Sequence, residues 1–107
     1  MTREQLFPKD VEARMPSFAD VASTRLEDLV AEVKFFYPDF GWTWYGIAWD
    51  GEDRFFGWVD GDDGELGEFS LTELTALRGK LGCEIERDLS FQPTPIYELA
   101  ERREERV

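Results

Sequence analysis

The chain has 107 residues, of which 42% are hydrophobic and 15% aromatic, and a formal net charge of −12 without a single histidine. These values fit one domain with a packed core and exclude wholesale disorder. They also exclude Ser-His-Asp and Cys-His catalysis, and they remove most of the usual zinc ligands.

No apolar run reaches the roughly 18 residues that span a bilayer, and the N-terminus lacks the apolar core of a signal peptide. We therefore expect a cytoplasmic protein. Cys83 is the one cysteine. Because Glu84 and Glu86 lie close to it in sequence, its thiolate is disfavoured and a reactive role is not expected.

The first 22 residues have a mixed composition, and "KDVEARM" predicts a short helix that ends before Pro16. The next stretch fits two structures. Thr24 with Glu27 resembles a capping box, and the apolar residues that follow have helical spacing. Yet "LVAEVKFFY" is also rich in strand formers and stops at Pro38. Periodicity alone leaves residues 25–33 open between helix and strand.

The middle of the chain predicts an antiparallel meander. Strands at 42–49, 54–60 and 65–70 are separated by the turns "DGED" and "GDDG". Alternation places Trp42 and Trp44 on one face of the first strand, and Tyr45 and Trp49 on the other. Since both faces are apolar, we expect a sheet covered on both sides, with most of the rings in the core.

The C-terminal third predicts two helices and one strand. Ser70 resembles an N-cap with Glu73 as its partner, and "EIERDLSF" is typical of a strand. Thr94 and Pro95 would open a last helix whose polar end, residues 101–107, frays. The chain therefore predicts a single α+β domain over residues 1–107. Its antiparallel meander has about four to five strands, packed with two to three short helices.

Acidic residues concentrate in the meander. Residues 38–77 contain ten acids and one base, which gives −9 in that segment and leaves −3 for the rest of the chain. A basic partner protein fits this charge, whereas direct binding to nucleic acid or to an anionic membrane does not. The acids that we predict to bind a partner lie on the two turns and the third strand: Asp50, Glu52, Asp53, Asp60, Asp62, Asp63, Glu65 and Glu68.

Other chemistry is less well supported by the residues. "DGDDGELGE" fails the EF-hand pattern, because position 5 from Asp60 is Gly64 and position 12 is Leu71. Carboxylate pairs are abundant but point to no particular cleft. We expect no catalytic residue, no metal site and no cofactor. Arg87 lies among apolar residues on its strand face, where an arginine usually pairs with a carboxylate; a ligand-binding role for it is the alternative.

The strings "VKFFYPDFGWTWYG", "FFGWVDG", "ELGEFSLTEL" and "GKLGCEIERDLSFQPTPI" resemble, in order and spacing, a small uncharacterised family. It is a domain of unknown function of plasmids, phages and the large polyvalent proteins of mobile elements. The resemblance covers about Val33 to Leu99. It implies a small α+β domain with an antiparallel sheet and places "VKFF" on a strand. It brings no established catalytic residue, and its setting is conflict between mobile elements and host defence.

Two functions follow as hypotheses. The first is a non-enzymatic acidic protein that inhibits a host defence nuclease, of the anti-restriction or anti-CRISPR kind, by occupying its basic nucleic-acid surface. The second is a small-molecule or nucleotide-binding module that uses exposed tryptophans, Trp42 and Trp44, together with Arg87. A third reading, a carboxylate enzyme that needs a divalent ion, lacks a supporting motif. The sequence leaves the oligomeric state open.

Overall fold

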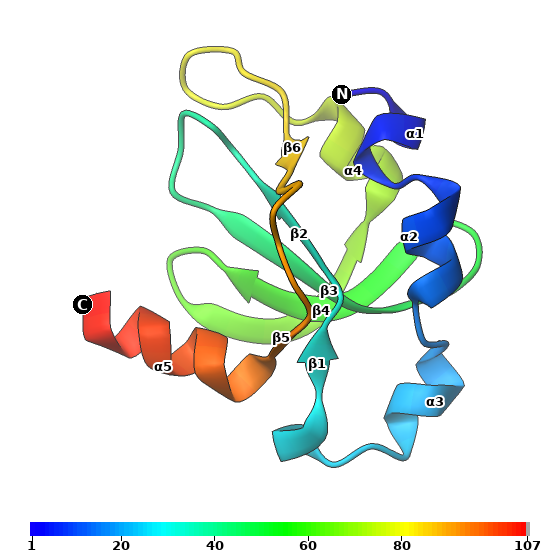
Figure 1. Ribbon diagram of the computed structural model, residues 1–107. Coiled ribbons are helices and arrows are strands. Elements are labelled where there is room, and N and C mark those ends of the chain that lie inside the picture. Colours follow the sequence, from blue (N-terminus) through cyan, green and yellow to red (C-terminus); the bar gives the residue numbers. More distant parts are fainter. Residues whose placement is uncertain (107) are drawn as a thin grey trace.

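Four consecutive strands form the antiparallel meander that the turn pattern predicts (Figure 1). The computed structural model describes residues 1–106. Its main sheet has the order β5-β4-β3-β2-β6, and a small second sheet pairs β1 with β7. The strands are β1 (Val30–Ala31), β2 (Val33–Phe36), β3 (Thr43–Trp49), β4 (Arg54–Asp60), β5 (Gly64–Ser70), β6 (Glu86–Arg87) and β7 (Thr94–Pro95). The α+β class and the antiparallel arrangement are confirmed.

Short helices cover the sheet and connect its strands. They are α1 (Arg3–Leu6), α2 (Lys9–Arg14), α3 (Phe18–Ala22), the 3-10 helix η1 (Leu26–Asp28), α4 (Leu71–Ala76) and α5 (Ile96–Arg106). The helix predicted in "KDVEARM" is α2, and Ser70 caps α4 as expected, accepting from the Glu73 amide at 3.1 Å. Capping boxes at Thr2 and Ser17 add α1 and α3, so the N-terminus is more helical than predicted.

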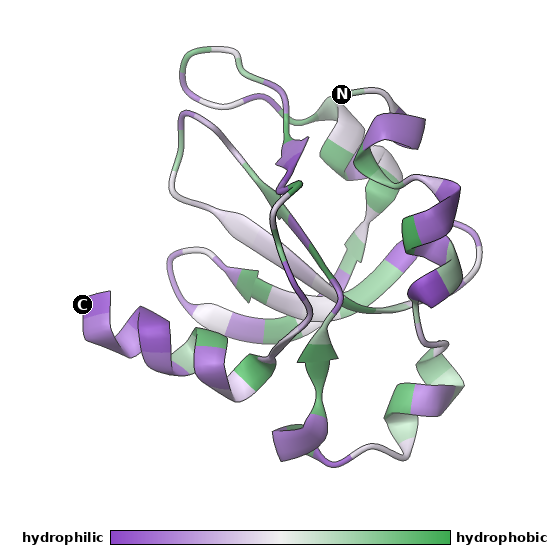
Figure 2. Cartoon of the chain, viewed as in Figure 1, coloured by the Kyte–Doolittle hydropathy of each residue, from purple (hydrophilic) through white to green (hydrophobic). Residues whose placement is uncertain are grey.

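The sheet separates two hydrophobic cores, as the apolar character of both strand faces predicts. The larger core lies under α1, α2 and α4, and it includes the fully buried rings of Phe35 and Phe55. The smaller core lies under α5 and contains Tyr45, Ile47 and Trp58. Figure 2 shows that the last turns of α5 are hydrophilic, so only the start of this helix packs on the smaller core.

One face assignment in β3 is wrong. Strict alternation puts Trp49 with Tyr45 and Ile47, but Trp49 packs in the larger core, against Phe55 and Phe7. The cause is a register shift between Gly46 and Ala48, where β3 carries one residue more than β4. Such a bulge exchanges the faces of all residues that follow it.

The ambiguous segment is η1 followed by β1 and β2, so strand is confirmed from Val30 to Phe36, with a break at Glu32. The capping box of Thr24 with Glu27 does not form, because the Thr24 hydroxyl donates to the Asp20 carbonyl oxygen. The predicted strand "EIERDLSF" is correct only at Glu86–Arg87. It ends there because Asp88 begins a turn, accepting from the amides of Ser90 and Phe91.

The C-terminal helix also differs from expectation at both ends. Thr94 and Pro95 pair as β7 with β1, so α5 begins one residue later, at Ile96. Residues 101–106, expected to fray, are helical. Arg103 and Arg106 tie this end to the sheet through the buried carboxylate of Asp60. Residue 107 lies outside the described residues.

Candidate functional site

The predicted acidic residues lie at two opposite ends of the meander. The turn between β3 and β4 holds Asp50, Glu52 and Asp53, whereas the turn between β4 and β5 holds Asp62 and Asp63. Strand β4 separates the two turns by seven residues, or about 20 Å at a rise of roughly 3.3 Å per residue. The two acidic turns therefore form separate regions, while the predicted acids Glu65 and Glu68 lie on β5, alongside β4.

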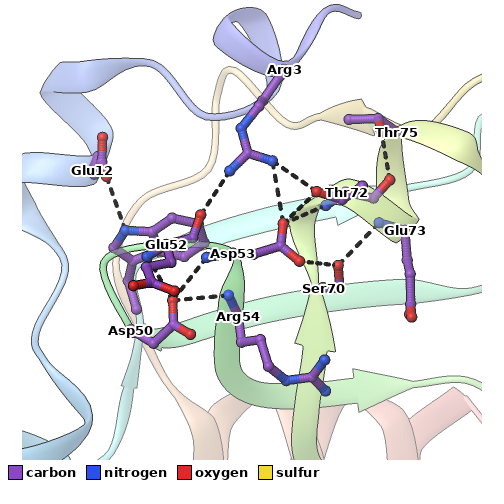
Figure 3. Close-up of polar contacts among 11 residues, drawn as sticks. Arg3, Glu12, Asp50, Glu52, Asp53, Arg54, Ser70, Thr72, Glu73 and Thr75 are labelled. Carbon is purple, nitrogen blue, oxygen red and sulfur yellow. Dashed lines mark hydrogen bonds and ion pairs between the residues drawn. The ribbon is translucent and has the colours of Figure 1, made fainter.

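In the first turn, Asp50 serves the fold. Its Oδ1 accepts from the backbone amides of Glu52, Asp53 and Arg54 at 2.8, 2.9 and 3.0 Å. Figure 3 shows the carboxylate beneath the turn that it closes. These amide donors, that of Glu52 first, lower the pKa of Asp50, because they stabilise the charged form. Glu52 contributes its carbonyl oxygen, which accepts from Arg3, while its side chain is exposed.

Asp53 joins three distant parts of the chain (Figure 3). Its carboxylate accepts from the hydroxyl of Ser70, from the amide and hydroxyl of Thr72 at 2.9 and 2.6 Å, and from Arg3 at 3.3 Å. The hydroxyl of Ser70, then that of Thr72, holds the pKa of Asp53 well below its ordinary range. This residue fastens the first turn to the junction of β5 with α4 and to α1.

In the second turn, Asp60 and α5 hold the backbone in place. Asp60 is buried, with 5% of its surface exposed, and pairs with Arg103 and with Arg106, the latter at 2.6 Å. Arg103 also donates to the carbonyl oxygens of Gly61 and Asp62, at 3.1 and 2.6 Å. Beyond Asp60 these contacts use only backbone oxygens, so within residues 1–106 they leave the carboxylates of Asp62 and Asp63 unpaired.

Four of the predicted acids surround one groove beside Trp42, which we call the Trp42 groove. Its cavity has a volume of about 290 Å³. It is lined by Trp42, Val59, Gly61, Asp62, Asp63, Glu65, Leu66, Gly67 and Glu68. Within residues 1–106, only Glu68 of these acids has an ion-pair partner, Arg54 at 3.0 Å. The groove therefore presents an aromatic and aliphatic floor with unpaired negative charge around it.

Gly61 allows Trp42 to form that floor. A Cβ atom at Gly61 would lie 2.7 Å from two atoms of the indole ring, which real contacts do not allow. The ring is half-buried: it tilts against Trp44, with centroids 6.0 Å apart, and leaves one side to the groove. Leu66, on the edge strand β5, is 40% exposed and extends the apolar surface.

The other predicted binding residues do not join this groove. Trp44 is buried, with 6% exposure, and belongs to the larger core. Arg87 lies on β6, at the opposite edge of the sheet from β5, so Trp42 and Arg87 do not share a site. The ion pair expected for Arg87 is not formed within residues 1–106; its Nε donates instead to the carbonyl oxygen of Gln5, at 3.3 Å.

Cys83 lies beside Asp39. Desolvation and then the Asp39 carboxylate raise the pKa of the Cys83 thiol, so the thiolate is disfavoured, although through Asp39 more than through the neighbouring glutamates. Across residues 1–106, no three His, Cys, Asp or Glu side chains gather as a metal site would require. No helix in this part of the chain combines the length and apolar character needed to cross a bilayer.

Asp53 and Asp60, the acids that bind other parts of the chain, have partners far away in the sequence. Asp53 depends on Arg3 and Thr72, and Asp60 depends on two arginines of a segment that resembles a disordered tail. No local pattern separates these acids from Asp62 and Asp63. Ser70 and Thr72, which flank Leu71, are recognisable as residues of a helix start, but only the structure shows that their hydroxyls donate to Asp53.

Comparison with protein families gives one match: the family described as "Protein of unknown function (DUF2958)" matches residues 6–105. The chain belongs to this family, which confirms the resemblance to an uncharacterised domain. Searches of curated proteins and of solved structures gave no match.

Proposed function

We propose that this member of the DUF2958 family is a non-enzymatic acidic interaction protein of a mobile element. Its partner is a basic protein of host defence, and its effect is inhibition of the anti-restriction or anti-CRISPR kind, through occupation of a nucleic-acid-binding surface. The observation that carries the proposal is the Trp42 groove, where three carboxylates without an ion-pair partner among residues 1–106, those of Asp62, Asp63 and Glu65, lie around a half-buried tryptophan ring.

The chemistry of the groove suits lysine and arginine side chains. A cation over an indole face gains about 0.5–2 kcal/mol, depending on how far it is desolvated. Asp62, Asp63 and Glu65 add negative charge on a turn and on an edge strand, close to that ring. Duplex DNA attracts the same basic surfaces with roughly one charge per 1.7 Å of its axis. To inhibit such a partner, the groove needs only to compete with DNA phosphates for the partner's lysine and arginine side chains.

The edge position of β5 supports an interface with protein. An edge strand has unpaired backbone groups, and charged side chains such as Glu65 and Glu68 keep it from pairing with other acidic or apolar edges. The same charges favour a basic segment. The counter-defence setting itself rests on the motifs "VKFFYPDFGWTWYG" and "GKLGCEIERDLSFQPTPI" and their resemblance to domains of mobile elements.

The test is an inhibition assay with purified restriction nucleases and CRISPR effector complexes, reading their DNA binding with and without the protein. We expect inhibition of at least one of them, weaker at high salt because surface charges are screened over about 8 Å at physiological ionic strength. The charge-reversed variant D62K/D63K should lose inhibition. The control E4K/E101K makes the same charge change at two exposed positions outside the groove and should retain it.

Two results would overturn the proposal. One is inhibition that is unchanged between low and high salt, which would rule out charge as the basis of binding. The other is an equal loss of inhibition in D62K/D63K and in E4K/E101K, which would show that net charge matters and the groove does not.

A further inference from the structure

A second cavity lies near β2 and β6, towards the other edge of the main sheet from the Trp42 groove. Its volume is about 420 Å³, and it opens between α2, the junction of β1 with β2, and the segment that follows β6. Figure 1 shows this last segment crossing in front of β2 on its way to β7. We call it the Arg87 cavity; the residues used below are Val11, Arg14, Glu32, Arg87 and Phe91.

The arginines of this cavity are unusual for this chain. Acids outnumber bases by 24 to 12, and most basic side chains have a carboxylate within ion-pair distance. Arg14 and Arg87 have none among residues 1–106. They come from different elements, the end of α2 and β6, and converge on one cavity. Two guanidinium groups without a carboxylate can bind an anionic group with paired hydrogen bonds.

Glu32 supplies the opposite charge. It lies in the break between β1 and β2 and is half-buried, and within residues 1–106 its side chain makes no hydrogen bond. Burial raises the pKa of Glu32, and the charge of Arg14 opposes that rise. A half-buried carboxylate of this kind is stabilised by a ligand that donates hydrogen bonds or carries positive charge.

The remaining charges leave the cavity balanced. Asp88 is neutralised by Lys34, at 3.4 Å, and Asp10 is exposed on α2. Among residues 1–106, the charged lining residues without an ion-pair partner are thus Arg14, Arg87, Glu32 and Asp10. Part of the lining is apolar: Val11 is buried, and the ring of Phe91 is held against Tyr45 at a centroid distance of 5.8 Å. A ligand that fits carries both signs of charge on a frame with apolar surface.

We propose that the Arg87 cavity binds a small zwitterion of the amino-acid or short-peptide class. Its carboxylate lies at Arg14 and Arg87, its ammonium at Glu32, and its apolar part against Val11 and Phe91. The volume is within the range of about 300–1,000 Å³ that is usual for small-ligand sites. This site is independent of the proposed partner surface, because it uses neither Trp42 nor the acidic turns.

The test uses glycyl-phenylalanine as the probe, with saturation-transfer NMR reading its contact with the full chain. We expect saturable binding, and a loss of at least about tenfold in affinity when either end is blocked, because each block removes a charge-assisted contact. Equal binding of the N-acetyl form would overturn the proposal, since the site would then recognise an anion. Equal binding of the C-amide, or no binding of any form, would overturn it as well.

Variants locate the site. R14Q and E32Q should each weaken binding of the probe by at least about tenfold, while K80Q, which changes an exposed lysine on another loop, should leave it unchanged. R14Q alters an exposed side chain and is expected to fold, which a far-UV circular dichroism spectrum checks. Affinities of R14Q and E32Q equal to that of K80Q would contradict the assignment of the cavity.

Discussion

The two acidic turns of the meander are similar in sequence but differ in what their carboxylates contact. "DGED" and "GDDG" each combine glycine with acids between two strands. In the first, Asp50 and Asp53 accept hydrogen bonds from their own turn, from α4 and from Arg3. In the second, Arg103 holds the backbone, and the side chains of Asp62 and Asp63 have no hydrogen-bond or ion-pair partner among residues 1–106.

The difference shows that a turn acid serves the fold when hydrogen-bond donors reach it, either from its own turn, as for Asp50, or from distant residues, as for Asp53. The partners of Asp53 lie up to 50 residues away, at Arg3, and those of Asp60 lie 43 and 46 residues away, at Arg103 and Arg106. An acid with such partners stabilises the fold, and an acid without them is available to another molecule. The following predictions separate these two cases.

The largest effect is expected for Asp60→Asn. The change leaves two guanidiniums beside a neutral amide in a buried position, and removing one partner of a buried ion pair costs about 3–5 kcal/mol. Because Arg106 is 60% exposed, we expect about 3 kcal/mol. Urea denaturation measures it, with Asp63→Asn on the same turn as the control. Equal midpoints for the two variants would contradict the anchoring role of Asp60.

A smaller loss is expected for Asp53→Asn. The amide keeps one acceptor but turns its NH₂ group toward donors that it cannot serve, the hydroxyl of Ser70 or the amide of Thr72. Loss of charge-assisted hydrogen bonds of this kind costs about 2 kcal/mol in the free energy of unfolding. Glu52→Gln, on the same turn with an exposed side chain, is the control and should stay within about 0.5 kcal/mol of wild type.

Asp50 and Asp53, the two acids of the first turn that accept hydrogen bonds, predict how the stability of the fold depends on pH. The pKa values of Asp50 and Asp53 are lower in the folded chain than their ordinary value. Their stabilisation is therefore complete above the unfolded pKa, near 3.9, and is lost as the pH falls below about 4 toward the folded values. Urea midpoints measured from pH 7 down to pH 3 should fall steeply for wild type and less steeply for Asp53→Asn. Parallel curves would show that Asp53 contributes nothing to the acid sensitivity.

Much of the fold could be predicted because its signals are local. Turn residues between short apolar strands define the meander, and Ser70 marks the start of α4 by its own side chain. The face of Trp49 could not be predicted, because a one-residue bulge depends on how β3 and β4 pair. For the same reason Thr94 and Pro95, a typical helix start, become a strand when Val30 and Ala31 lie beside them.

The candidate site, like the fold, could be predicted from the sequence only in part. The acidic turns could be predicted from composition and spacing. That Trp42, expected to act with Trp44 and Arg87, lies beside Asp62 and Asp63 depends on how β3 pairs with β4. That Trp44 is buried, and that Arg87 lies at the far edge of the sheet, depends on strand order. Arg103 illustrates the limit most clearly, since a polar C-terminal segment gives no sign that it positions turn residues 41 and 42 positions earlier.

The smallest effect on stability is expected for the double variant D62N/D63N. Neither carboxylate has an ion-pair partner within residues 1–106, so the change should stay within about 0.5 kcal/mol of wild type. Relief of repulsion among neighbouring carboxylates would make the variant slightly more stable than wild type. Inhibition of a basic partner should nevertheless weaken, and its salt dependence should become shallower, because fewer charges take part. Urea denaturation and the inhibition assay, run on the same preparation, measure both. A loss in the free energy of unfolding as large as that of Asp53→Asn would show that the carboxylates of the second turn also stabilise the fold.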